Sequence, residues 1–229
     1  MPSVKRDSTI KEYQNFTKEV YGLPNDRQFS AWEMLSNVQR FLTRGLKGIR
    51  KKDNDKSKIN FLISFSWLVS LMNQLRIDLE DEIWKRFPYL CSHCRNCPCV
   101  CKEKHITERH QNILRNEAKR PKTLTEFQNM FEKIYPSKKR TTEHAGIHLA
   151  EELGELSEAM LVYHGSHQNE DFEKIPLEAA DVFSLYMDVF NSLKINMANE
   201  LSGLFYDNCH VCHKAPCQCA FTFITKFES

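Results

Sequence analysis

The sequence predicts an all-α protein built from two tandem helical repeats, each followed by a small four-cysteine knuckle. Three observations support this fold class. Only 7 Gly and 8 Pro occur in 229 residues, which argues against a turn-rich β fold. Apolar residues recur at helical spacing over long stretches. The nine cysteines fall into two short clusters with the same pattern.

Composition narrows the class of protein further. The 32 Lys and Arg nearly balance the 30 Asp and Glu, so nucleic acid and anionic membrane are not expected as main partners. No apolar run reaches the length of about 18 residues that a membrane span needs. Residues 1–20 carry charges throughout, so no secretory signal is expected. We therefore expect a cytoplasmic protein.

The two cysteine clusters are copies of one motif. One reads CSHCRNCPCVC and the other CHVCHKAPCQC, and both fit C-x-x-C-x-x-x-P-C-x-C. Four cysteines of the first cluster match four of the second at an offset of 118 residues: Cys91, Cys94, Cys99 and Cys101 against Cys209, Cys212, Cys217 and Cys219. Cys97 is the extra thiol and falls opposite Ala215.

Close clusters of thiols that stay reduced in the cytosol indicate metal sites rather than disulfides. Four thiolates suit tetrahedral zinc, so we predict that these eight cysteines hold two structural Zn²⁺ ions. An iron–sulfur cluster in each repeat is the alternative. Three histidines within the clusters could replace a thiolate: His93, His210 and His213.

The register of the cysteines extends upstream. At the offset of 118, Asn73 and Ile77 match Asn191 and Ile195. Near the N-terminus the offset is 114, where Thr9 matches Thr123. The sequence therefore predicts a first repeat in residues 1–101, a basic, solvated linker in 102–122, and a second repeat in 123–229.

The helices follow from the apolar spacing. In the second repeat, a short helix is expected over 125–135. A long helix carries the apolar stripe from Leu149 to Met160 and ends near Gly165, and another helix begins at Pro176. A last helix runs to Tyr206. The first repeat has the same pattern, which predicts helices over 32–46, 60–74 and 79–87. The tail alternates apolar and polar residues over 221–227 and predicts a short strand.

Acidic residues gather on two helices of the second repeat. Glu151, Glu152 and Glu155 form E-E-x-x-E, and Glu178 and Asp181 form E-x-x-D on the next helix. Residues three and four apart share a helix face, so a helical hairpin would bring the two acidic faces together. Carboxylates at close range repel unless a cation neutralises them, and hard oxygen ligands suit Mg²⁺. A solvated acidic face is the simpler alternative.

These residues resemble the MazG family of all-α nucleoside triphosphate pyrophosphohydrolases. The resemblance lies in HLAEELGELSEA from His148, LEAADV from Leu177 and LKIN from Leu193, and it covers about 124–204. It implies that Glu152, Glu155, Glu178 and Asp181 bind Mg²⁺ and that Glu151 orients or deprotonates the attacking water. It also implies cleavage of a nucleotide between its α and β phosphates.

The first repeat lacks these acids. It keeps Glu33 at the place of Glu151, but four other residues stand opposite the implied metal ligands: Met34, Asn37, Asn60 and Ile63. We therefore expect one active site in each chain. Members of the family usually pair two subunits, so the two repeats are expected to form an internal pseudo-dimeric helical bundle, and such chains could associate further. Trp32 or Trp67 could stack on a base, although packing in the core is the simpler role.

The sequence thus predicts a Mg²⁺-dependent nucleotide pyrophosphohydrolase that converts a nucleoside triphosphate to a monophosphate and pyrophosphate. The alternative is a binding or regulatory module that holds a nucleotide with little or no turnover and docks a partner through its zinc knuckles.

Overall fold

The computed structural model describes residues 2–106 and 114–220, and the regular secondary structure in that part of the chain is helical, with no strand there. This confirms the all-α class. Within the same residues, no helix combines the length and the hydrophobicity that a membrane span requires. The strand expected over 221–227 lies outside the described residues.

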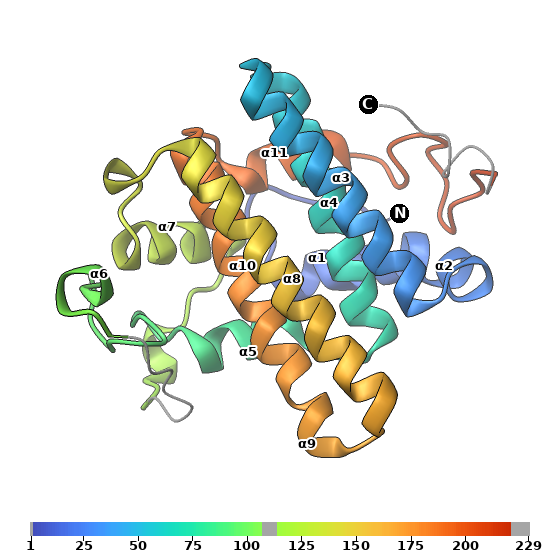
Figure 1. Ribbon diagram of the computed structural model, residues 1–229. Helices are drawn as coiled ribbons and strands as arrows, with labels where there is room; N and C mark the ends of the chain where they lie inside the picture. The colour runs from blue at the N-terminus through green and yellow to red at the C-terminus, as the bar shows by residue number, and fades with distance from the viewer. Residues whose placement is uncertain (1, 107–113, 221–229) are drawn as a thin grey trace. The chain divides into compact units, whose positions relative to one another are not determined.

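The chain divides into two compact units. Unit 1 comprises the described part of residues 1–78 and 197–229. Its helices are α1 (Ile10–Thr17), η1 (Lys18–Gly22), α2 (Leu23–Gln28), α3 (Ala31–Lys51), α4 (Asn54–Gln74) and α11 (Met197–Leu204). The antiparallel pair of α3 and α4 forms its largest helix contact (Figure 1).

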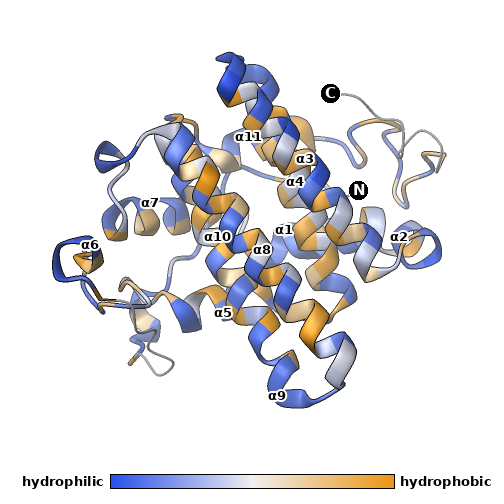
Figure 2. Cartoon of the chain, viewed as in Figure 1, coloured by the Kyte–Doolittle hydropathy of each residue, from blue (hydrophilic) through white to orange (hydrophobic). Residues whose placement is uncertain are grey.

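Unit 2 comprises the described part of residues 79–196. Its helices are α5 (Leu79–Arg86), α6 (Cys101–Lys104), η2 (Glu117–Lys119), α7 (Leu124–Ile134), η3 (Ser137–Lys139), α8 (Thr142–Ser166), α9 (Asn169–Phe172) and α10 (Lys174–Ser192). Helix α10 packs against α8, α5 and α7 (Figure 1). Every residue from 181 to 190 is buried, and hydrophobic residues recur along this helix (Figure 2).

The units cut across the sequence repeats. Unit 1 joins the first helices of repeat one to the last helix and cysteine cluster of repeat two, and unit 2 joins the reverse set. The chain crosses from one unit to the other after Asp78 and returns after Asn196, which are equivalent positions at the offset of 118. The repeats have therefore exchanged their C-terminal segments.

Matching contacts support both the repeat and the exchange. In unit 1, the backbone N–H of Cys217 donates to the carbonyl of Val20 at 2.7 Å; in unit 2, that of Cys99 donates to Ile134 at 2.8 Å. These pairs are equivalent in the two repeats. The rings of Tyr21 and Phe205 meet edge to face at 6.3 Å, and those of Tyr135 and Phe87 do the same at 6.3 Å.

The turn after the second long helix is also repeated. Arg76 and Lys194, at matching positions, both have left-handed backbones, with φ of 59° and 57°. The side-chain amide of Gln14 donates to the carbonyl of Ile77 at 2.6 Å, and that of Gln128 donates to Ile195 at 2.8 Å. Asn73 and Asn191 return hydrogen bonds to the backbone carbonyls of these two glutamines. The two asparagines therefore support equivalent turns in the two repeats.

Most described residues of the linker are exposed, as its composition predicts, but its end contacts α5. Of its described residues, Arg120 forms ion pairs with Glu80 and Asp81 on α5. The indole N–H of Trp84, which is almost fully buried, donates to the Glu117 carboxylate at 2.9 Å. The end of the linker thus packs within unit 2 because α5 offers it acidic and aromatic partners.

Candidate metal centres

An acidic group forms where α8 and α10 pack in unit 2. Glu152 comes from α8, and Glu178 and Asp181 come from α10; each offers a carboxylate oxygen, and the three oxygens lie within 4.8 Å of one another. The stripe of Leu149, Leu153 and Leu156 buries one face of α8 and so sets Glu152 beside the neighbouring helix. Asp181 is buried, and the two glutamates are half-buried. Three hard oxygen donors in this arrangement suit a divalent cation.

Arg86 at the end of α5 holds one member of this group. Its Nε donates to Asp181 Oδ1 at 3.1 Å, and its Nη2 donates to Oδ2 at 2.9 Å. The arginine side chain is 3% exposed and the aspartate 7%, so the pair is almost completely shielded from water. Each carboxylate oxygen keeps a second lone pair when it accepts one hydrogen bond. The pair therefore fixes the orientation of Asp181 and leaves it able to bind a cation.

Arg86 was not among the residues that the sequence singled out, although a signal was present. At the offset of 118 it falls opposite Leu204, next to the matched Phe87 and Phe205. Repeat one thus has a charged residue where repeat two has an apolar one. Such a difference indicates that Arg86 has a charged partner that Leu204 does not need.

The other predicted acids lie outside the group. Glu151 is 64% exposed, and its carboxylate lies 3.9 Å from His148 Nε2. Glu155 is exposed as well. Three residues advance a helix by about 300°, which leaves Glu155 about 60° from Glu152 around α8. The roles of Glu151 in activating water and of Glu155 as a ligand stay predictions.

A second buried carboxylate lies two turns further along α10. Asp188 Oδ2 accepts from Arg140 Nη1 at 2.6 Å, while its Oδ1 is buried without a hydrogen-bond partner among the described residues. Burial raises the pKa of the Asp188 carboxyl, against the opposing effect of Arg140. Burial likewise lowers the pKa of His148, and the nearby His144 and Arg140 act in the same direction.

The counterparts of the acids in repeat one make contacts within their own helices. The side-chain amides of Asn37 and Asn60 donate to the carbonyls of Glu33 and Lys56, each four residues earlier. Met34 and Ile63 are buried. Glu33, which stands at the place of Glu151, accepts a hydrogen bond from the Ser30 backbone and completes the capping box of α3. None of these side chains belongs to a group of possible metal ligands in the described residues.

The cysteines form two groups of four, one in each unit, and no disulfide is present. Five pairs of sulfurs lie 3.5–3.9 Å apart: Cys91–Cys101, Cys94–Cys99, Cys209–Cys219, Cys212–Cys217 and Cys209–Cys217. Four sulfurs about 2.3 Å from a tetrahedral zinc ion would lie about 3.8 Å apart. Both groups therefore fit a structural zinc ion.

Backbone amides support both knuckles in the same way. The N–H groups of Val100 and Gln218, which are equivalent, donate to Cys94 and Cys212 sulfurs at 3.4 Å. Such donors favour the thiolate form that a metal needs. Cys97 is exposed and belongs to neither group.

Comparisons of the chain with protein-family models, with curated proteins and with solved structures find no match.

Proposed function

We propose that unit 2 is a Mg²⁺-dependent nucleotide pyrophosphohydrolase. The observation that carries the proposal is the convergence of Glu152, Glu178 and Asp181 from two packed helices. Bound there, Mg²⁺ would neutralise phosphate charge and make the attacked phosphorus more electrophilic. The reaction adds water across the bond between the α phosphorus and its bridging oxygen, releasing a monophosphate and pyrophosphate.

In this proposal the site residues have different roles. Glu152, Glu178 and Asp181 would bind the cation, and Arg86 would keep the carboxylate plane of Asp181 fixed. Glu151 is exposed and adjoins His148, so it can accept a proton from water and pass it to solvent. The burial of Asp181 also favours cation binding, because a shielded site strengthens the attraction between opposite charges.

The test is pyrophosphate release from a panel of standard and modified nucleoside and deoxynucleoside triphosphates, with and without Mg²⁺. Glu152→Gln and Asp181→Asn should lower kcat/KM by at least about 100-fold, since removal of one electrostatic stabiliser commonly costs about 10²–10³. Glu158→Gln changes an exposed acid of the same helix and should leave turnover unchanged. Full turnover by the first two variants would refute the site.

One observation favours a second candidate, a module that binds a nucleotide with little or no turnover. Both Asp181 oxygens accept hydrogen bonds from Arg86, whose positive charge opposes a divalent cation nearby. The same panel separates the candidates. Nucleotide binding without pyrophosphate release by the parent protein would favour the module and refute the hydrolase.

A further inference from the structure

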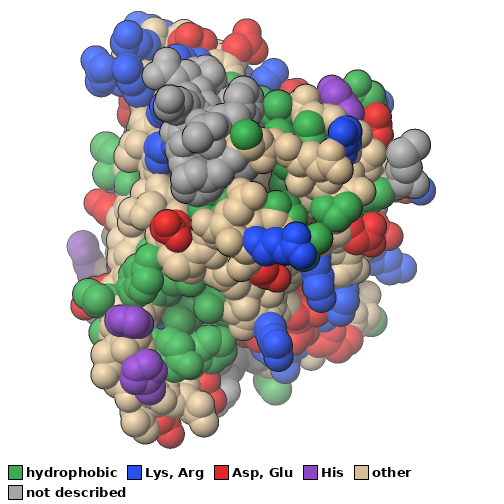
Figure 3. Space-filling model, turned by 90° about the vertical axis from the view of Figure 1, so that its right-hand side faces the viewer, with side chains coloured by type: hydrophobic (Ala, Val, Ile, Leu, Met, Phe, Trp, Pro, Cys, Tyr) green, Lys and Arg blue, Asp and Glu red, His purple; other side chains and the backbone are tan. Residues whose placement is uncertain are grey.

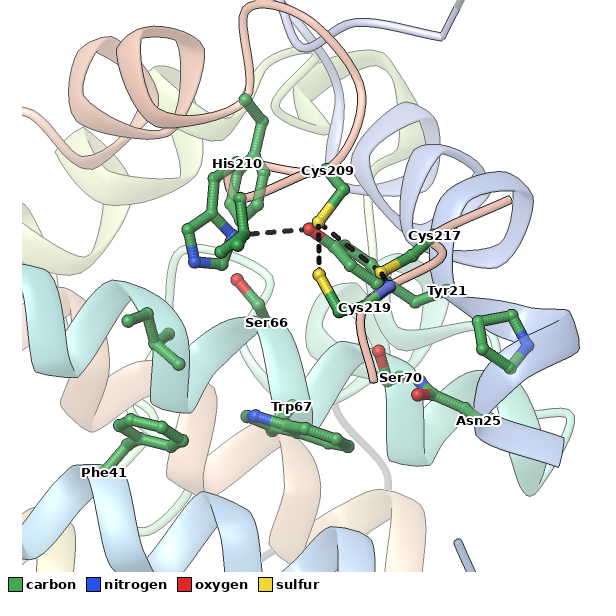
Figure 4. Close-up of a pocket in the computed structure, with 14 residues that line it drawn as sticks. Tyr21, Asn25, Phe41, Ser66, Trp67, Ser70, Cys209, His210, Cys217 and Cys219 are labelled. Atoms are coloured by element: carbon green, nitrogen blue, oxygen red, sulfur yellow. Dashed lines mark hydrogen bonds between the residues drawn. The ribbon is translucent and has the colours of Figure 1, made fainter. Parts of the chain in front are cut away.

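Unit 1 contains an apolar pocket between α2, α4 and the chain that follows α11. It is a cavity of about 90 Å³ (Figure 4). Its apolar wall includes Phe41, Ile63, Trp67 and Phe205. Trp67 is half-buried, and Phe29 packs edge to face against its ring at 5.1 Å. Trp67 therefore presents ring surface to the pocket and is itself held in place.

The pocket lies on the helix face that carries the acids in the other unit. Ile63 stands opposite Asp181 at the offset of 118, and Ser70 stands opposite Asp188. No Lys, Arg, Asp or Glu side chain lines it. Three cysteines of the second cluster, Cys209, Cys217 and Cys219, also line it, so the pocket adjoins the group that fits a zinc ion. It offers no Lys or Arg side chain to compensate a phosphate group.

Polar side chains gather at one end of this region. Asn25 and Ser70 line the pocket and a smaller cavity of about 50 Å³ that shares them. Gln74, which lines the smaller cavity, has a buried Oε1 without a hydrogen-bond partner among the described residues. Buried polar groups are normally hydrogen-bonded, so the Gln74 acceptor, with the Asn25 and Ser70 side chains beside it, is suited to a polar ligand edge.

Figure 4 shows the Trp67 ring with Phe41 on one side and Asn25 and Ser70 on the other. An aromatic floor with a polar end fits a flat ring that carries hydrogen-bonding groups on one edge. Where the view in Figure 3 is not covered by grey atoms, hydrophobic side chains form small groups among polar and charged ones.

We propose that unit 1 binds a small, uncharged, planar aromatic heterocycle in this pocket. The ring packs against Trp67 and Phe41, and its polar edge bonds to the Asn25 carboxamide and the Ser70 hydroxyl. Asn25 offers both a donor and an acceptor, so it can match an amidine or lactam edge. The site is distinct from the acidic group of unit 2 and does not depend on the function proposed for it.

The experiment measures binding of adenine and indole to the full-length zinc-loaded protein, by isothermal titration and by saturation-transfer NMR of the probe. Both probes are neutral and planar, and cyclohexanol serves as a non-planar comparison. Adenine should bind in preference to cyclohexanol. Failure of both adenine and indole to bind up to their solubility limits would overturn the proposal.

Variants locate the binding. Asn25→Asp keeps the shape of the side chain but removes its donor, and it should weaken adenine binding about tenfold or more, as loss of one buried hydrogen bond does. Trp67→Ala should weaken both probes. Asn15→Asp makes the same chemical change at an exposed position of unit 1, and Glu152→Gln alters the acidic group of unit 2; both should bind adenine as the parent does.

Far-ultraviolet circular dichroism and zinc content show whether each variant is folded. If Asn25→Asp is unfolded, Ser70→Ala replaces it, with a smaller expected loss of about threefold, since one neutral hydrogen bond is removed. Unchanged adenine affinity in Trp67→Ala together with the folded polar variant would overturn the proposal. So would an equal loss in Glu152→Gln, because that result would place the probe in the other unit.

Discussion

Replacing Arg86 with Leu tests whether the buried ion pair of unit 2 organises the acidic group. Leucine is the residue that repeat two carries at this position, as Leu204. Removing one partner of a buried pair costs about 3–5 kcal/mol, whereas an exposed pair contributes about 0–1 kcal/mol. The two hydrogen bonds of 2.9 and 3.1 Å and the near-complete burial of both side chains place Arg86 and Asp181 in the first class.

The loss should depend on pH. Without Arg86, no guanidinium balances the three carboxylates, one oxygen of each of which lies within 4.8 Å of the others. Like charges at this range repel, and the repulsion weakens as acid protonates carboxyl groups. The variant should therefore lose less stability at pH 5.5 than at pH 8. Added Mg²⁺ should stabilise the variant more than the parent, because the cation replaces the missing positive charge.

The assay is urea denaturation followed by Trp84 fluorescence in a Trp32→Phe, Trp67→Phe background, so that the signal comes from unit 2. Lys85→Leu is the matched control, since Lys85 is 43% exposed and its pairs with Asp81 and Glu82 lie at the surface. The control should lose about 1 kcal/mol or less. A loss for Arg86→Leu no larger than that of the control would refute the reasoning.

Three further predictions concern packing, protonation and chain exchange. Gly48→Ala should destabilise the protein by about 1–3 kcal/mol in thermal unfolding, because the added Cβ would lie 2.7 Å from the backbone nitrogen of Ser57. Gly154→Ala is the control: its added Cβ has nothing within 4 Å, so it should stabilise the protein by about 0.5–1 kcal/mol. Equal effects of the two changes would contradict the packing of Gly48 against Ser57. The raised pKa of Asp188 means that its proton is bound more tightly in the folded state, so the stability of the parent relative to Asp188→Asn should rise as pH falls from 7.5 to 5, and a constant difference would count against it. Cleavage of the chain between residues 106 and 114 should leave two fragments that elute together in gel filtration, because each unit contains segments from both; separate elution would argue against the exchange.

Helical periodicity predicted the elements well because each long helix buries a regular stripe. The stripe from Leu149 to Met160 lies on α8, and the helix expected to begin near Pro176 is α10, whose first turns include that proline. The predicted end near Gly165 also agrees with the structure: α8 ends at Ser166 and is followed by His167 with a left-handed backbone. The start was less predictable, since α8 begins at Thr142, before the stripe.

The exchange between repeats could not be read from local patterns. The apolar residues of α5, such as Leu79 and Ile83, require only a hydrophobic partner, and α4 and its counterpart α10 both offer one. The choice depends on the path of the chain after Asp78 and Asn196, which periodicity does not encode. By contrast, motif spacing predicted that Glu152, Glu178 and Asp181 would come together, because residues three and four apart share a helix face and the two helices form a hairpin.

The exchange also accounts for the retention of a repeat without acids. Through its C-terminal segment, repeat one supplies unit 2 with α5, with Arg86 and with the first cysteine group. Helix α5 packs on the same helix, α10, that carries Glu178 and Asp181. Repeat two alone would lack these parts, and its Asp181 would be buried without its guanidinium partner. The loss of acids from repeat one therefore does not make that repeat dispensable: the acidic group of repeat two is held in place by residues of repeat one.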